Sequence, residues 1–332
     1  MKQVINYGLI IICVLSLNHC IKRSDSILLE DPYLGQKSPS MIPEIFAPNL
    51  ISKGYHELGI TISNDNHEIF YIMSDRNYQH YSLINMKKIN NSWTKPEIAD
   101  FALDKSVYTC FFSPDDKGLY FSTNRSVVVN VDTLKGVNNW FVEKKESKWQ
   151  EPKLINEYFD KGKSYRIQSI SELKNIYLTR KVSNGNTNIF VSRFIDGKFL
   201  SPQPINGFIN SEYDEGRPFI APDESYLIFQ SDRPGGFGSN DLWISYCESG
   251  IWEEPINLGN QINTEASEFA PYISPDGKYL FFSSYRSLKK TEIIDKNYDE
   301  LIDLYGSSRN GYATLYRMSS EIIESLNGCD TL

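Results

Sequence analysis

Acidic and arginine side chains recur at matching positions along this chain of 332 residues, and they are the residues best suited to chemistry. Glu57, Glu215 and Glu268 each stand six residues before the start of a polar turn. The arginines that follow five such turns are Arg76, Arg125, Arg180, Arg233 and Arg286. A carboxylate beside a guanidinium forms a strong ion pair, whereas two carboxylates that flank a sugar can hydrolyse a glycosidic bond. The pattern therefore predicts either paired charges or acid–base chemistry.

Few other residues have the types and spacing of a catalytic site. Beyond the first 20 residues the chain has three histidines, His56, His67 and His80, and His67 falls in a turn. The chain has no Gly-x-Ser-x-Gly nucleophile motif and no His-Glu-x-x-His zinc motif. We therefore predict that the protein is not an enzyme and uses no cofactor or metal. The alternative is a carbohydrate-active hydrolase or lyase that uses Glu215 or Glu268 with an arginine or His56.

Five copies of one sequence pattern organise the chain and must position these groups. The clearest copies span residues 221–233 and 274–286, and weaker copies span 113–125, 63–76 and 171–180. Each copy combines a polar turn with a short aromatic run, which is typical of two antiparallel strands. An aromatic residue three positions before a proline then recurs at intervals of 50 to 56 residues. Four strands in each unit of about fifty residues are typical of a propeller blade.

We therefore predict an all-β fold, a single β-propeller of four-stranded antiparallel blades. Five blades follow from the count, and the weak middle copy leaves six open. Residues 46–51 echo residues 253–258 of the outer part of a blade, but no inner strands precede them. The last unit lacks such a segment after residues 314–318. We expect the N-terminal segment to supply that outer strand and close the ring, because closure removes exposed strand edges.

The best copies also carry a family resemblance. Residues 274–286 read Ser-Pro-Asp-Gly-Lys-x-Leu-x-Phe-x-Ser-x-Arg, and residues 252–259 read Trp-x-x-Pro-x-Asn-Leu-Gly. With Asp-Leu-Trp at residues 241–243, this pattern resembles the WD-repeat-like β-propellers of the TolB type over residues 33–326. The segments at 33–37 and 43–48 resemble those of envelope proteins of this kind. The resemblance implies the propeller fold and a place in the cell envelope, but no particular activity.

Propeller topology predicts where the charged residues lie. The first two strands of a blade are antiparallel, so the start of the first and the end of the second share one face of the ring. Acids and arginines should therefore meet around one mouth of the central channel, and Val107 and Tyr165 make this mouth asymmetric by replacing the acid in two blades. The predicted ligand-binding residues are Glu57, Arg76, Glu215, Arg217, Arg233, Phe237, Glu268 and Arg286. The alternative is that each arginine bridges to the acid of a neighbouring blade and only holds the ring together.

Two loops on that face interrupt the repeat. Residues 233–241 form a glycine-rich loop whose Phe237 could stack on a sugar or a peptide. Residues 287–311 form an insertion in which apolar residues recur at helical spacing, at Ile294, Tyr298, Leu301 and Tyr305. We predict one helix near 291–305, with Gly306 as its stop, lying as a cap over the mouth. The alternatives are an ordinary connection for the first loop and simple packing for the second.

The N-terminus predicts export. An apolar run from Leu9 to Leu17 follows Lys2, and it is too short for a membrane span but typical of a secretory signal. Leu17 lies three residues before Cys20, as in a bacterial lipobox. We predict a signal peptide at 1–20 with lipid attached at Cys20, a tether at 21–36, the propeller at 37–327 and a tail at 328–332. The alternative is a secretory signal without lipid.

Together these features predict a non-catalytic binding protein of the cell envelope, an outer-membrane lipoprotein facing the periplasm or the cell surface. Its partner would be an envelope protein, a peptide or a glycan, held at the acid- and arginine-lined mouth. Membrane contact would come through the lipid anchor alone. A net charge of −8 without a basic cluster disfavours nucleic-acid binding. The oligomeric state does not follow from the sequence.

Overall fold

The computed structural model describes residues 26–27, 33–103, 106–125, 127–129, 132–134, 136–156, 159 and 163–327. The predicted signal peptide, its Cys20 and the tail at 328–332 lie outside the described residues. No helix among the described residues is long and apolar enough to cross a membrane.

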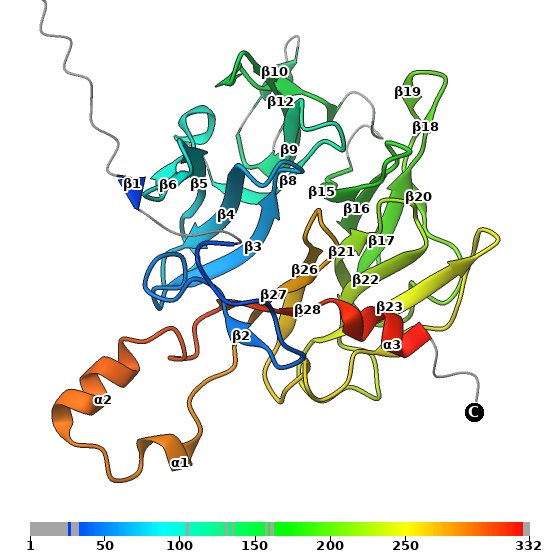
Figure 1. Ribbon diagram of the computed structural model, residues 1–332. Helices are drawn as coiled ribbons and strands as arrows, with labels where there is room; N and C mark the ends of the chain where they lie inside the picture. Colours follow the sequence, from blue (N-terminus) through cyan, green and yellow to red (C-terminus); the bar gives the residue numbers. More distant parts are fainter. Residues whose placement is uncertain are drawn as a thin grey trace, which may run out of the picture.

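Five antiparallel sheets stand around a central axis, so the predicted five-bladed propeller is confirmed (Figure 1). From the channel outward, the first blade consists of β3 (His56–Ile62), β4 (Glu68–Ser74), β5 (Tyr81–Ile89) and β7 (Glu97–Ile98). The second consists of β8 (Val107–Phe112), β9 (Gly118–Thr123), β12 (Asn138–Lys145) and β14 (Lys153–Leu154). The third consists of β15 (Arg166–Ile170), β16 (Ile176–Lys181), β17 (Thr187–Ser192) and β20 (Gln203–Pro204).

The fourth blade consists of β21 (Glu215–Ile220), β22 (Tyr226–Ser231), β23 (Asp241–Glu248) and β25 (Ile256–Asn257). The fifth consists of β26 (Glu268–Ile273), β27 (Tyr279–Ser284), β28 (Thr314–Ser319) and β2 (Glu44–Ile45). Short strands extend the outer hairpins or their loops: β6 (Ser92–Thr94), β10 (Val127–Val129), β11 (Asp132–Leu134), β13 (Lys148–Trp149), β18 (Phe194–Ile195), β19 (Lys198–Phe199) and β24 (Ile251–Trp252). A 3₁₀ turn, η1, spans Asp100–Ala102.

The ring closes through its N-terminal segment, as predicted, but with different residues. Strand β2 pairs with β28, and the Phe46 N–H donates to the Leu315 carbonyl over 2.8 Å. In blade four, the Leu258 N–H makes the equivalent bond to Leu242. Residues 44–46 therefore take the place of residues 256–258, five residues earlier than the sequence echo suggested. The register follows burial, because Phe46 is fully buried against Phe281, with the ring centroids 5.0 Å apart.

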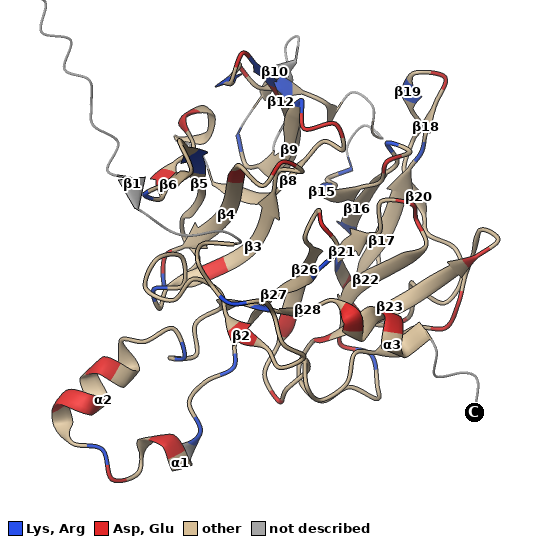
Figure 2. Cartoon of the chain, viewed as in Figure 1, with Lys and Arg blue, Asp and Glu red and all other residues tan. Residues whose placement is uncertain are grey.

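The insertion is helical, as predicted, but in two pieces and not over the mouth. Helix α1 spans Lys290–Ile293 and helix α2 spans Tyr298–Tyr305. Asp295 has a left-handed φ of 64°, and the Asn297 side chain then caps α2 by accepting the Glu300 N–H. Both helices project away from the ring and carry mostly acidic charge (Figures 1 and 2). The predicted cap is therefore wrong, since no residue of α2 is buried.

Both ends of the described chain pack on the propeller. Tyr33 and Leu34, which the sequence assigned to a tether, are buried in a core cluster, and the Tyr33 hydroxyl donates to Asp276 over 2.8 Å. The two-residue strand β1 (Ser26–Ile27) pairs with β6. At the other end, helix α3 (Glu321–Asn327) buries Ile323, whose carbonyl accepts the Tyr246 hydroxyl. Through these contacts the two terminal segments pack against blades one, four and five.

Candidate functional site

A cavity of about 410 Å³ follows the axis of the ring. It is lined by the innermost strand of every blade, so it is the central channel of the propeller. At one end it reaches the five polar turns, where Asn64 and Glu172 are exposed. At the other end it reaches Tyr108 and Arg217. Of the eight ligand-binding residues predicted from the sequence, only Arg217 lines this cavity.

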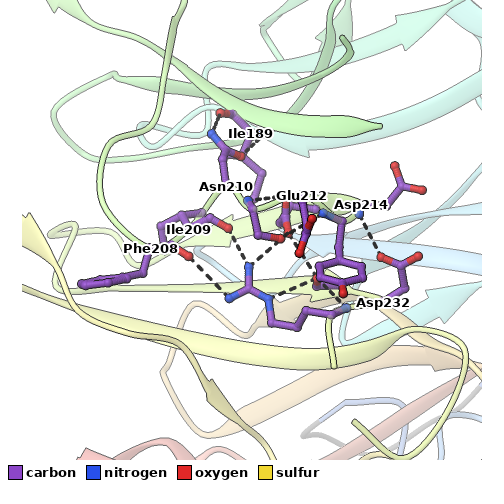
Figure 3. Close-up of polar contacts among 12 residues, drawn as sticks. Ile189, Phe208, Ile209, Asn210, Glu212, Asp214 and Asp232 are labelled. Carbon is purple, nitrogen blue, oxygen red and sulfur yellow. Dashed lines mark hydrogen bonds and ion pairs between the residues drawn. The ribbon is translucent and has the colours of Figure 1, made fainter. Parts of the chain in front are cut away.

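The acid and arginine of blade four form a closed, buried pair. Glu215 Oε1 lies 3.2 Å from Arg233 Nη2, and the Glu215 carboxylate also accepts the Ser211 N–H. The same guanidinium donates to the carbonyls of Phe208 and Ile209, which lie in the segment entering the blade (Figure 3). Glu215 is fully buried, so this group ties a connection to two strands of one blade. The pairing is therefore within a blade, and not between blades as the structural alternative supposed.

Blade five repeats the same arrangement. Glu268 Oε1 lies 3.4 Å from Arg286 Nη2, and Glu268 is also fully buried. The Glu268 carboxylate accepts the Thr264 N–H over 2.9 Å, and the Arg286 guanidinium donates to the Ile262 carbonyl over 2.5 Å. Because both carboxylates are fully buried and their oxygens accept hydrogen bonds within the blade, neither Glu215 nor Glu268 is placed to act as an acid or base on a ligand.

Blade one departs from this arrangement. Arg76 is exposed and turns toward Tyr55 and Tyr312, with its guanidinium carbon 5.9 and 5.5 Å from the two ring centroids. Glu57 is thus left without an arginine. It is fully buried, it accepts the Lys53 N–H over 3.1 Å, and its Oε2 has no hydrogen-bond partner among the described residues. Burial raises the pKa of Glu57 to about 8.

This buried acid predicts a stability that depends on pH. The folded-state pKa of Glu57 lies above its ordinary value of 4.5, so folding favours the protonated form. Between about pH 5 and pH 8 the unfolded chain ionises Glu57 while the folded chain does not, and stability therefore falls as pH rises. We expect Glu57→Gln to match the wild type at pH 5 and to exceed it by roughly 2 to 4 kcal/mol above pH 8. Urea unfolding at both pH values measures this.

Glu215→Gln is the matched control for that experiment. It removes a carboxylate that has an arginine partner, so it should destabilise the protein at neutral pH by roughly 3 kcal/mol. A Glu57→Gln variant that is also less stable than the wild type at pH 8 would contradict the assignment of an unpaired acid.

The glycine-rich loop is explained by its own packing. A Cβ at Gly238 would stand 2.0 Å from the Ala266 carbonyl oxygen, so the close approach is to the chain itself and not to a ligand. The N–H groups of Phe237 and Gly238 donate to the Asp241 carboxylate over 2.6 and 2.9 Å. Phe237 is half exposed, and it does not line the channel. Its predicted role in binding stays a prediction.

Arg217 occupies an exceptional backbone position at the end of the channel opposite the polar turns. The innermost strand of every blade has a bulge near its start, and the backbone there is left-handed in three of them. The φ angles are 80° at Gly59, 45° at Arg217 and 52° at Ala270. A left-handed conformation costs a residue with a side chain on the order of 1 kcal/mol or more. Blade four therefore carries a strained arginine where blades one and five carry the smallest residues.

Around Arg217 lies a group of residues that we call the arginine–tyrosine cluster. Its members are Arg166, Arg217, Tyr78, Tyr81, Tyr108 and Tyr285. The Arg166 guanidinium carbon lies 5.0 Å from the centroid of the Tyr108 ring, which lies 5.1 Å from that of Tyr81. The Arg217 guanidinium carbon lies 4.9 Å from the centroid of Phe269, which contacts Tyr285. The cluster draws residues from all five blades and stands on the predicted face of the ring.

The cluster has positive charge, and no acid among the described residues pairs with its arginines. The arginine ion pairs among the described residues involve four other arginines, Arg233, Arg286, Arg309 and Arg317. Neither Arg166 nor Arg217 has a carboxylate or a side-chain hydrogen-bond partner in the described part of the chain. Burial lowers the pKa of Arg217, and the nearby charge of Arg166 lowers it further. Two adjacent cations of this kind attract an anion, and a carboxylate suits a guanidinium best.

His56 supports the cluster from the protein interior. It is buried and stacks on Tyr78, with the ring centroids 3.9 Å apart. Its Nδ1 lies 2.6 Å from the Tyr78 hydroxyl and 3.0 Å from the Ala313 nitrogen. The Tyr78 hydroxyl also contacts the Tyr285 hydroxyl. A hydrogen-bonded chain therefore runs from Tyr285 at the mouth to His56 in the core.

Sequence reasoning missed Arg166 and the four tyrosines, although a signal was present for Arg166 and Tyr108. Tyr108 and Arg166 directly follow Val107 and Tyr165, the two positions where the acidic pattern lapses. Val107 and Tyr165 are buried in the blades, and successive strand residues point to opposite sides. Tyr108 accordingly lines the channel, and Arg166 is exposed. In the part of the chain that the structure describes, no three His, Cys, Asp or Glu side chains are grouped as metal ligands would be.

Comparisons with known proteins return the fold alone. No protein-family model matches the chain, and no curated protein matches it in sequence. A putative TolB from Agrobacterium tumefaciens is 14% identical with a TM-score of 0.46, over 80% of this chain and 90% of that one. A xylan β-1,4-xylosidase from Bacillus halodurans is 12% identical with a TM-score of 0.47, over 82% and 54%. A periplasmic gluconolactonase from Pseudomonas aeruginosa is 12% identical with a TM-score of 0.37, over 70% and 65%.

This chain thus spans about half the length of the xylosidase. Two of the three matched propellers are named as enzymes. The prediction that this protein is not an enzyme is therefore wrong as it stands, because the fold does not exclude catalysis. The similar structures include a putative TolB, and membership of an envelope lipoprotein family stays a prediction.

Proposed function

We propose that this protein binds an acidic glycan at the arginine–tyrosine cluster. The observation that supports this most strongly is the pair of guanidinium groups, Arg166 and Arg217, without a carboxylate partner among the described residues. Arg217 is partly buried, whereas Arg166 is exposed. A partly buried cation without a counter-ion is costly, and a ligand carboxylate would offset that cost through charge-assisted hydrogen bonds. The strained backbone of Arg217 fits a functional position, because strain persists where the surrounding fold imposes it.

The tyrosines favour a sugar as the body of the ligand. A pyranose ring presents a flat, weakly polar face and several hydroxyl groups. The rings of Tyr81 and Tyr108 are both partly exposed, and a phenol offers an apolar face together with a hydrogen-bonding hydroxyl. The cavity behind Arg217 adds further polar side chains, including Thr109 and Gln168. A mostly apolar channel with a few polar groups is typical of sites for small ligands and chain ends.

The cell envelope supplies the setting for such a ligand. The apolar run from Leu9 to Leu17 and the cysteine at position 20 support export and lipid attachment. We propose an envelope lipoprotein of the TolB-like kind, anchored through Cys20 and tethered near the membrane. In that position the propeller would meet the acidic polysaccharides of the cell surface or the periplasm.

A calorimetric titration tests the proposed function. The probes are hexamers of galacturonate, mannuronate and glucuronate, with hexamers of galactose, mannose and glucose as neutral controls. We expect at least one acidic hexamer to bind more tightly than its neutral counterpart by on the order of 30-fold, the contribution of about 2 kcal/mol from a charge-assisted pair. Equal affinity for acidic and neutral hexamers, or no binding of any of them, would contradict the proposal.

A further inference from the structure

The hydrogen-bonded chain from Tyr285 to His56 has a defined direction. A backbone N–H can only donate, so the contact from Ala313 assigns His56 Nδ1 as an acceptor without a proton. The proton of the imidazole then lies on Nε2, which is 3.4 Å from the Arg76 carbonyl oxygen. The Tyr78 hydroxyl therefore donates to Nδ1 over 2.6 Å, and Tyr285 donates to Tyr78. Tyr285 can therefore pass a proton to Tyr78, and Tyr78 can pass one to His56.

His56 is neutral at the start of such a transfer. Burial lowers the pKa of His56, so the imidazole is neutral at neutral pH and its Nδ1 can accept a proton. Tyr285 is partly exposed at the other end and packs against Phe269 with Arg217 on the same ring, at centroid distances of 5.1 and 4.9 Å. The outer end of the chain therefore lies beside the guanidinium that would hold a ligand carboxylate.

We propose that the Tyr285–Tyr78–His56 chain makes the arginine–tyrosine cluster a lyase site that cleaves uronate-containing glycans by β-elimination. This inference rests on the proposed function, because it needs the ligand carboxylate at Arg217 and Arg166. A carboxylate held by two guanidinium groups makes the proton on the neighbouring C5 carbon more acidic, since the charge that develops on removal is stabilised. No oxidant, reductant or water enters the reaction.

The elimination balances with these residues alone. The C5–H bond breaks and its proton moves to Tyr285 Oη, while the Tyr285 phenolic proton moves to Tyr78 and the Tyr78 proton moves to His56 Nδ1. The electron pair of the C5–H bond forms the C4=C5 double bond, and the C4–O bond to the next sugar breaks. Tyr285 gives a proton to the leaving oxygen, and the protons on His56 and Tyr78 move back outward. The products are an unsaturated uronate and a shortened chain, and the protein is unchanged.

The enzymatic alternative drawn from the sequence used Glu215 or Glu268. The lyase proposal gives neither of these residues a role. Glu215 and Glu268 are fully buried and paired with arginines of their own blades. The phenol of Tyr285 takes over the role of the group that touches the sugar. Tyr78 and His56 act through it, as positioning residues that also store the proton.

The test follows the absorbance of the conjugated C4=C5 double bond when the full-length protein is mixed with the three acidic hexamers. We expect the wild type to form this product from at least one hexamer. Tyr285→Phe removes one oxygen atom and should lower kcat by about 1,000-fold while the affinity changes less than about threefold. Tyr78→Phe should lower kcat by about 100-fold with the same small change in affinity. Tyr312→Phe is the control, because its ring contacts His56, 4.8 Å between centroids, but lies outside the chain.

Two results would overturn the lyase proposal while the proposed binding function stands. One is a wild type that binds an acidic hexamer in the calorimeter but forms no unsaturated product. The other is a Tyr285→Phe variant that keeps the turnover of the wild type. If no acidic hexamer binds at all, the binding proposal itself fails, and the lyase proposal fails with it.

Discussion

Replacing Phe46 by alanine should lower the free energy of unfolding by about 3 to 5 kcal/mol, the usual cost of removing a buried phenylalanine. Phe46 is fully buried and contacts Phe281 of the innermost pair of strands in blade five. It directly follows β2, the strand that closes the ring, and its N–H bonds to Leu315. The lost packing therefore acts on the join between the first and last parts of the chain. Urea unfolding followed by tryptophan fluorescence measures the change.

Ile42→Ala is the matched control for ring closure. Ile42 belongs to the same N-terminal segment, but 68% of its surface is exposed. Its truncation should change stability by less than about 0.5 kcal/mol. If Phe46→Ala costs no more than Ile42→Ala, the N-terminal segment does not hold the ring shut.

Replacing Arg217 by glycine should weaken the binding of an acidic hexasaccharide by on the order of 30-fold, which corresponds to about 2 kcal/mol for a charge-assisted hydrogen-bonded pair. The fold already accepts this residue at this place, because Gly59 occupies the equivalent bulge of blade one with a φ of 80°. Relief of backbone strain offsets the lost contact with Phe269, so stability should change by less than about 1 kcal/mol. Binding and folding are thus separated in one variant.

Arg193→Ala is the control for the loss of charge. Arg193 is exposed and lies just after β17 of blade three, outside the lining of the channel. It should leave the affinity within about threefold of the wild type, because an exposed charge far from the ligand is screened by salt. Arg217→Lys should recover only part of the affinity, since an ammonium cannot pair with a carboxylate through two parallel hydrogen bonds.

The fold could be predicted from the sequence because the sequence patterns that specify it are local and repeated. A polar turn and the aromatic run after it specify a hairpin, and five hairpins at constant spacing specify a ring. The N-terminal register and the division of the helical insertion into two pieces did not follow. Short outer strands of two residues carry little pattern, and the burial of Phe46 decides between alternative registers. Asp295 breaks the helical insertion through a left-handed backbone that apolar spacing does not reveal.

Of the residues in the candidate site, the sequence predicted Arg217 but not Arg166 or the four tyrosines. Strand direction placed Arg217 on this face of the ring, and ligand binding there stays a prediction. The acids were predicted to bind a ligand because they recur at matching positions. In the structure Glu215 and Glu268 instead form ion pairs with arginines of their own blades. Tyr78 and Tyr285 lie more than 200 residues apart in the sequence and meet only through closure of the ring. Contacts of that kind depend on tertiary packing and leave no spacing signal.

The central claim is that Arg217 and Arg166 recognise the carboxylate of a sugar, and one comparison tests it directly. The same hexasaccharide is titrated in its acidic form and after chemical reduction of its carboxyl groups to alcohols, with the wild type and with Arg217→Gly/Arg166→Ala. We predict that the acidic form binds the wild type on the order of 30-fold more tightly than the reduced form, and that this ratio falls to about one in the double variant. A ratio that is the same in both proteins would show that the two arginines do not bind the carboxylate.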